Sequence, residues 1–131
     1  MGLAEFEYLV ANMTEALVAP DPHFDCIHML SEAHWGKLRD QVATHAPDWR
    51  EALAYVLSQG PTHEALPLLS TLLRDAHACV AQQAALSLVD LTDLEPALVI
   101  PEGDLNVMRQ IASNATDHLD DLRTFLSNTT A

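Results

Sequence analysis

The sequence has little lysine, little glycine and no long apolar run. Lys37 is the only lysine among 131 residues, and 19 acidic residues stand against six basic ones, so the formal net charge is −13. A surface of this sign repels phosphate backbones and anionic lipids and attracts basic partners. The composition therefore disfavours nucleic-acid and membrane binding and favours a basic protein as the partner.

Only four glycines are present, and none of them forms a glycine-rich phosphate-binding loop. The Gly-x-Ser-x-Gly elbow of hydrolases and the His-Glu-x-x-His helix of zinc proteases are also missing. The carboxylates are numerous, but they are scattered along the chain in the manner of solvated helix faces. We therefore expect a protein without catalytic activity and without a cofactor.

Cysteine is scarce as well. Cys26 and Cys79 lie far apart and show no paired spacing, which indicates a reduced, cytoplasmic chain rather than a disulfide framework. Residues 1–20 contain Glu5, Glu7 and Glu15 but no basic segment and no unbroken apolar run, so we expect neither a signal peptide nor a membrane span there. The length fits a single domain over residues 1–131.

Apolar residues recur at spacings of three and four through most of the chain, which predicts helices and almost no strand. In the first half we expect a helix over residues 3–19, a loop over 19–29 that buries Phe24 and Ile27, a helix from the cap Ser31 to about Thr44, and a helix from the cap Asp48 to Gly60.

Residues 62–92 show the clearest pattern, that of two amphipathic helices joined by a corner at residues 74–77. The first helix is capped by Thr62, contains Pro67, and has its apolar face at Leu66, Leu69, Leu72 and Leu73. The second has its inner face at Val80, Ala84, Leu88 and Leu91, with Ala81 and Ala85 small enough for close approach. Neither helix can bury its own face, so the hairpin needs neighbours on both sides.

The hairpin resembles a HEAT repeat through Pro67, Asp75, Val80, the pair Ala84-Ala85 and Leu88. The sequence has Ala81 where that family usually has a basic residue, which is the position that pairs with the aspartate of a neighbouring repeat. The resemblance covers about 30 residues, and repeats of this type recur at about 40–47 residues. It implies a binding scaffold and no particular chemistry.

After the hairpin, residues 93–102 read as a connector whose apolar patch, 97–100, plugs the core. Asp104 then caps a last helix, which the periodicity carries to about residue 127 as one element. A break near residues 114–116 is the alternative, because asparagine and threonine often end helices. The expected class is all-α, a short right-handed α-solenoid or helical bundle of about six to seven helices, HEAT-like.

One loop groups potential metal ligands: His23, Asp25, Cys26 and His28, with His34 close behind. Imidazole, thiol and carboxylate suit a soft divalent metal, but no known zinc spacing is matched. A surface loop with Cys26 packed as a small apolar residue is the simpler interpretation, so we expect no metal. A nucleophilic role for Cys26, or for Cys79 beside His77, lacks an orienting third group.

The acidic residues of the C-terminal half are the candidate partner-binding residues. They are Asp90, Asp93, Glu95, Glu102, Asp104, Asp117, Asp120 and Asp121. Any one of them can equally be a helix cap or part of an ordinary exposed face.

Two functions from different classes fit this pattern. A small, strongly acidic chain suits an inhibitor or immunity-type protein that neutralises a basic toxin or nuclease domain, and we favour this hypothesis. The alternative is an adaptor or subunit of a larger complex that binds a partner helix or peptide without catalysis. A metal-dependent regulator is a third hypothesis, and the broad apolar stripe of the first helix leaves self-association open.

Overall fold

The computed structural model describes residues 2–115 and 119–129, and every regular element within those ranges is helical. The predicted all-α class is confirmed. The elements are α1 (Leu3–Ala11), η1 (Met13–Leu17), α2 (Asp21–Ile27), α3 (Glu32–Gln41), η2 (Val42–Thr44), α4 (Pro47–Leu57), α5 (Thr62–Leu73), α6 (Ala78–Leu94), α7 (Glu102–Asn114) and α8 (Asp120–Thr129), where η marks a 3-10 helix. In this part of the chain, no helix combines the length and the apolar character needed to cross a membrane.

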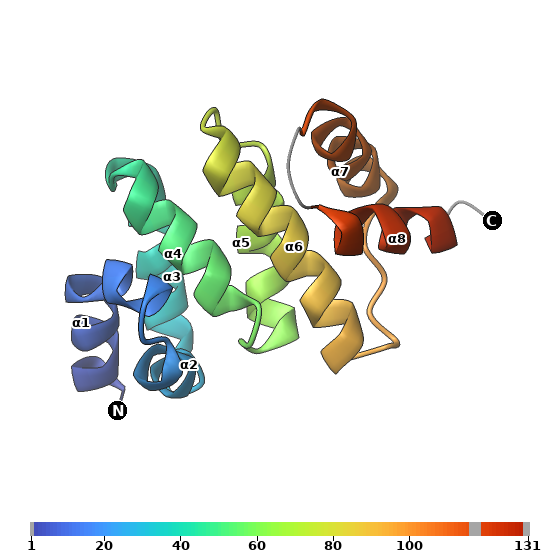
Figure 1. Cartoon of the computed structure of the whole chain (residues 1–131). Helices are drawn as coiled ribbons and strands as arrows, with labels where there is room; N and C mark the ends of the chain where they lie inside the picture. Colours follow the sequence, from blue (N-terminus) through green and yellow to red (C-terminus); the bar gives the residue numbers. More distant parts are fainter. Residues whose placement is uncertain (1, 116–118, 130–131) are drawn as a thin grey trace.

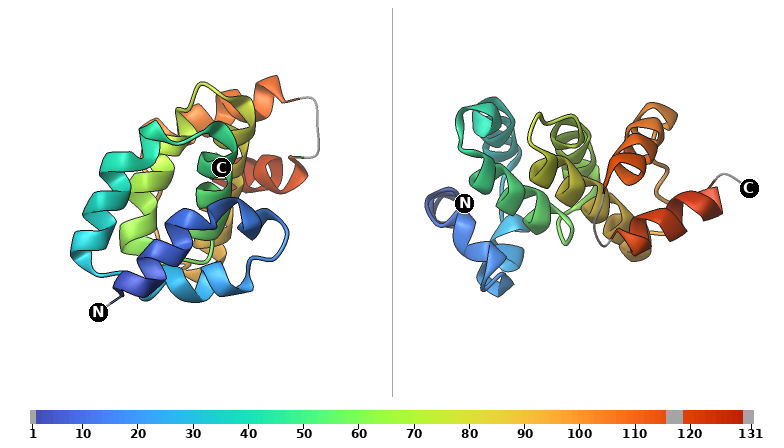
Figure 2. Two further views of the ribbon diagram at one scale, coloured as in Figure 1. Left: turned by 90° about the vertical axis from the view of Figure 1, so that its left-hand side faces the viewer. Right: turned by 45° about the horizontal axis from the view of Figure 1, so that its top comes forward.

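The helices follow one another from one end of an elongated molecule to the other (Figure 1). Helices α1 and α2 lie near the N-terminus at one end, and α7 and α8 lie at the opposite end. Between them α4 and α6 run side by side, and α5 packs against α6. The right-hand view of Figure 2 shows the same order, with α3–α4, α5–α6 and α7–α8 as successive pairs.

Helix α6 is the centre of the core and contacts α4, α5, α7 and α8. The inner face expected from the sequence is buried without residual exposure, at Val80, Ala84, Leu88 and Leu91. The small Ala81 and Ala85 are also buried, which lets the neighbouring helices approach closely. Pro67 lies inside α5, as predicted, and the chain turns between α5 and α6 at residues 74–77.

Side chains of later helices supply hydrogen bonds to the C-terminal carbonyls of earlier ones. The indole Nε1 of Trp49 donates to the carbonyl oxygen of Val10 at 3.0 Å, near the end of α1. The hydroxyl of Ser87 donates to the carbonyl oxygen of Ala54 at 2.7 Å, in the last turn of α4. Carbonyls in the last turn of a helix have no N–H partner in that helix, and these two accept from another element instead. Each bond therefore satisfies a carbonyl and also ties two elements together.

An ion pair joins α4 to the corner between α5 and α6. Arg50 donates from Nε to Asp75 Oδ2 at 2.7 Å and from Nη2 to Asp75 Oδ1 at 3.3 Å. Burial would raise the pKa of Asp75, but the Arg50 hydrogen bond and charge and the His77 N–H outweigh it and hold the pKa below its ordinary value. Asp75 therefore has a basic partner from the preceding pair of helices, although Ala81 supplies none.

The helix starts differ from the sequence-based expectations at three places. Ser31 caps α3 as predicted, with its hydroxyl accepting from the His34 N–H at 3.3 Å. The predicted caps Asp48, Thr62 and Asp104 are wrong, because the N-caps of α4, α5 and α7 are Ala46, Pro61 and Pro101. In each case a proline at the N-cap or the first helical position sets the start, since its fixed φ suits that position and its missing N–H has no partner to lose there.

Two predicted boundaries are also wrong. The first helix ends at Ala11 rather than near residue 19, and the expected loop contains α2, in which Ile27 is buried and Phe24 only partly so. The single last helix is instead α7 and α8, so the alternative break after Asn114 is confirmed.

Of the connector patch, Ile100 is buried and Leu98 partly buried, whereas Val99 is 79% exposed.

Replacing Leu88 by alanine should destabilise the protein by about 2–5 kcal/mol, because it leaves a cavity beside the most buried helix. The matched control is Leu94→Ala on the same helix, where the side chain is 55% exposed and the expected change is within about 0.5 kcal/mol. Urea unfolding followed by circular dichroism measures both variants. Equal losses would contradict the central position of α6.

Replacing Asp75 by asparagine should cost about 1–3 kcal/mol at neutral pH, because it leaves the mostly buried Arg50 without its carboxylate. Because the pKa of Asp75 is lowered in the folded state, the charged carboxylate stabilises the wild type. That stabilisation is lost as the pH falls through the pKa of the folded state. The deficit of the variant should therefore shrink in acid. Unfolding of wild type, Asp75→Asn and the exposed control Asp40→Asn across pH measures this, and a pH-independent deficit would contradict it.

Candidate functional site

Three of the predicted partner-binding residues line one surface groove between α6 and α8. Asp90 and Asp93 come from α6 and Asp121 from the first turn of α8. The groove has a volume of about 300 Å³ and is completed by Val89, Thr124, Phe125 and Asn128. We call it the acidic groove.

The local structure explains this grouping. Asp90 and Asp93 are three residues apart, so they occupy the same face of α6. Helix α8 packs against α6 and brings Asp121 to that face, and a carboxylate in the first turn of a helix is favoured by the helix dipole. The residues that line the groove include no lysine, arginine or histidine.

The carboxylates of the acidic groove act on one another. Asp90 is exposed overall, but partial burial raises its pKa, and the negative charges of Asp93 and Asp121 raise it further. The charged form of Asp90 therefore lowers the stability of the folded state. A cation that entered the groove would remove part of that cost.

The arginines of α7 and α8 are bonded to other groups. Arg123 on α8 donates from Nη2 to the carbonyl oxygens of Ala112 and Ala115 at 3.2 and 3.1 Å. Arg109 on α7 donates to Glu102 Oε1 at 3.0 Å and to Asn106 Oδ1 at 2.6 Å. These contacts hold both guanidinium groups at α7, which leaves the charge of the acidic groove uncompensated by the residues that line it.

The remaining predicted acidic residues lie outside the groove. Glu95 accepts a hydrogen bond from the Thr62 hydroxyl, Glu102 pairs with Arg109, and the exposed Asp120 lies 3.9 Å from Arg123. Asp104 is only 4% exposed and binds Arg74 Nη1 at 2.7 Å and the Ser70 hydroxyl at 3.0 Å, which makes it a link between α5 and α7. Asp117 lies outside the described residues.

The potential metal ligands of residues 23–28 are only partly brought together, because Asp25, Cys26 and His28 line one surface hollow and His23 does not. His23 is buried and its Nε2 bonds the carbonyl oxygen of Asn12 at 2.7 Å, whereas Nε2 of His28 bonds that of Gln59 at 2.6 Å. His34 serves the capping box of α3 and stacks on Phe6. Among the residues that the structure describes, no three histidine, cysteine or acidic side chains have an arrangement that could hold a metal ion.

Neither cysteine is activated. Burial raises the pKa of the Cys26 thiol, and the charges of Glu5 and Asp25 add to the effect. Burial likewise raises the pKa of Cys79, with a further contribution from Glu51. A nucleophilic cysteine needs its thiolate, so both environments oppose that chemistry.

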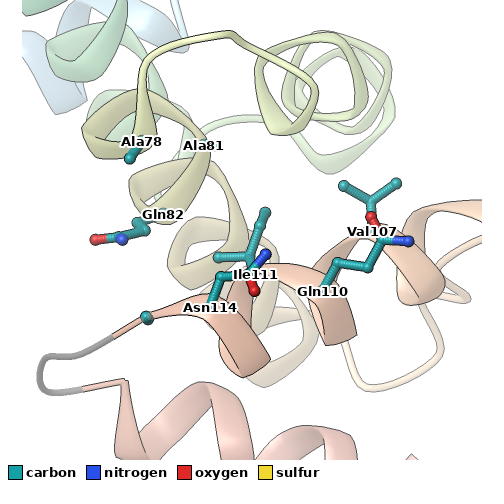
Figure 3. A pocket seen from close by; sticks show the side chains of 8 residues that line it. Ala78, Ala81, Gln82, Val107, Gln110, Ile111 and Asn114 are labelled. Atoms are coloured by element: carbon teal, nitrogen blue, oxygen red, sulfur yellow. The ribbon is translucent and has the colours of Figure 1, made fainter.

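Two apolar hollows were not anticipated from the sequence. Figure 3 shows the first, of about 240 Å³, between α6 and α7. Its apolar lining comes from Ala78, Ala81, Val107, Ile111 and Ala115, and Gln82, Gln110 and Asn114 supply carboxamides at its edge. We call it the α6–α7 hollow.

The second, the connector hollow, has about 280 Å³ and adjoins the acidic groove. Leu98, Val99 and Ile100 line it from the connector, with Leu105 from α7 and Phe125 from α8. The sequence marked residues 97–100 as apolar, but periodicity alone could not show that only part of this segment is buried.

No family model matches the sequence, and no curated protein or solved structure shows detectable similarity to it. The functional argument therefore depends on the geometry of this chain.

Replacing Asp90 by asparagine should stabilise the protein at neutral pH by about 0.2–0.5 kcal/mol, the size of a like-charge contact on a helix. A carboxyl whose pKa is raised by folding costs stability as pH rises through that range, so the gain should vanish in acid. Thermal unfolding at low salt measures it against Glu7→Gln, an equal charge change at an exposed position of α1. A gain that is no larger than that of the control would contradict the electrostatic account.

Proposed function

We propose that this chain is an acidic protein-binding scaffold that neutralises a basic toxin or nuclease domain, as an inhibitor or immunity-type protein does. The observation that carries the proposal is the acidic groove, where Asp90, Asp93 and Asp121 face one space without a basic residue among those that line it. The net charge of −13 extends the same sign over the whole chain.

The chemistry of the groove favours a lysine or arginine of a partner. A guanidinium can bond two carboxylates at once through charge-assisted hydrogen bonds, which are stronger than neutral ones. It would also relieve the repulsion that raises the pKa of Asp90. Because complementary fields mainly accelerate encounter, binding of this kind should be fast at low salt.

The proposed architecture is a short right-handed α-solenoid of HEAT type. The end-to-end order of the helical pairs in Figures 1 and 2 supports it. So does the position of Asp75, the aspartate of the HEAT-like pattern, which bonds Arg50 of the preceding pair. Scaffolds of this type bury a core between neighbouring pairs and leave their faces to partners.

A function without catalysis agrees with the environments of the two cysteines, which oppose thiolate formation. Both thiols are free, as a cytoplasmic protein would have them. The proposal accordingly assigns no cofactor and no metal, and the charge of the chain disfavours nucleic acid and membranes as partners.

An adaptor that binds a partner helix or peptide remains the second candidate, because the α6–α7 hollow offers an apolar surface without charged residues in its lining. Apolar contacts are insensitive to screening, whereas exposed charge pairs weaken as salt rises. The two functions therefore differ in their response to salt.

The test is affinity capture from the native cell extract at low salt, followed by kinetics with the captured partner. The triple variant Asp90→Asn, Asp93→Asn, Asp121→Asn should associate at least about tenfold more slowly than wild type, and salt should slow the wild type far more than the variant. The matched control, Glu7→Gln, Glu15→Gln, Asp40→Asn, has the same net charge but changes exposed residues outside the groove.

If the two triple variants behave alike, the groove has no special role. A partner that resists high salt and is unaffected by the groove variant would replace the inhibitor function with the adaptor function. Recovery of a basic domain whose association is slowed by the groove variant but not by the control would support the proposal.

A further inference from the structure

The acidic groove and the connector hollow are neighbouring halves of one surface. Phe125 lines both, and α6 contributes Asp93 to the groove and Thr92, the next residue along the chain, to the hollow. The negative half and the apolar half thus share the side chain of Phe125.

The hollow, of about 280 Å³, has room for one large apolar side chain. Its lining is mainly aliphatic and aromatic, and it includes Val99, which is 79% exposed. An apolar side chain placed there would cover Val99 and gain contact with Leu98 and Leu105.

Charge decides which occupant fits. A second copy of this chain carries −13 and would present the same sign to the groove, so self-association at this surface is disfavoured. A polyanion is disfavoured for the same reason. A cationic segment is attracted to the groove, and only a segment that also has an apolar side chain can use the adjoining hollow.

We propose that this composite surface binds an amphipathic cationic segment of the partner, with an arginine or lysine in the acidic groove and a large apolar side chain in the connector hollow. The proposal rests on the proposed function and adds the second half of the recognition. The apolar contact supplies affinity that salt does not screen, and the charged contact supplies speed and orientation.

Three fluorescein-labelled peptides test it by fluorescence anisotropy. The first is an amphipathic helical peptide with arginines and leucines. The second has serine in place of each leucine of the first. The third has glutamate in place of each arginine of the first. Wild type should bind the first about tenfold more tightly than the second, because the apolar side chain adds about 1.5 kcal/mol or more. The third should not bind measurably.

Val99→Ser tests the hollow without threatening the fold, because Val99 is largely exposed. It should weaken the arginine–leucine peptide about fivefold and leave the arginine–serine peptide unchanged. Val18→Ser is the matched control, since Val18 is 89% exposed, follows η1 and lines neither the hollow nor the groove. Asp93→Asn with Asp121→Asn should weaken both arginine peptides.

The outcomes separate the two proposals. If both arginine peptides bind equally and Val99→Ser has no effect, the composite surface is wrong and the acidic groove alone stands. If the groove variant binds all peptides as wild type does, the proposed function fails as well. Binding of the glutamate–leucine peptide, or a concentration-dependent dimer that Val99→Ser abolishes in sedimentation, would assign the hollow to another occupant and overturn the inference.

Discussion

The last four carbonyl groups of an α-helix have no partner within the helix, and this chain can seldom satisfy them with a glycine cap. In the described residues only Gly2 has a positive φ, and it precedes a helix rather than following one. Backbone N–H groups of the following turn bond several of them, such as the carbonyls of Tyr55, Val56 and Leu57 in α4. Side chains of neighbouring elements bond one more in each of three helices: Trp49 for α1, Ser87 for α4 and Arg123 for α7. Each of these side-chain bonds ties two elements together, α4 to α1, α6 to α4 and α8 to α7, and so limits how they can pack.

This constraint also positions the candidate site. Arg123 extends from α8 to the C-terminal end of α7, where it bonds two carbonyl oxygens. The same bonds tie α8 to the end of α7 and direct the Arg123 guanidinium to those carbonyls. Asp121 lines the groove with Asp90 and Asp93, and no basic side chain is among the described residues that line it. One arginine thus serves the fold and, by the same contact, leaves the acidic groove negative.

Those parts of the fold whose burial follows a regular apolar spacing could be predicted from the sequence. Those parts that depend on the contacts of single residues could not. The inner face of α6 was predictable because a spacing of three and four leaves one solution for burial. The starts of α4, α5 and α7, set by Pro47, Pro61 and Pro101, could not be separated from nearby polar caps, since cap and proline signals compete within one turn. For the candidate site, the pairing of Asp90 with Asp93 follows from helical spacing. The approach of Asp121 depends on the crossing of α8, which no local pattern encodes, and Asp104 could not be recognised as buried without knowing that Arg74 faces it.

Asp104 and Asp90 show how the same side chain takes opposite roles in one small domain. Asp104 is buried, and Arg74 and Ser70 satisfy it, so its charge strengthens the link between α5 and α7. Partial burial raises the pKa of Asp90, and the two neighbouring carboxylates raise it further, so its charge is a cost to the folded state. A neutral residue at position 90 would remove that cost, and a cationic side chain placed in the groove would reduce it by the same electrostatic argument.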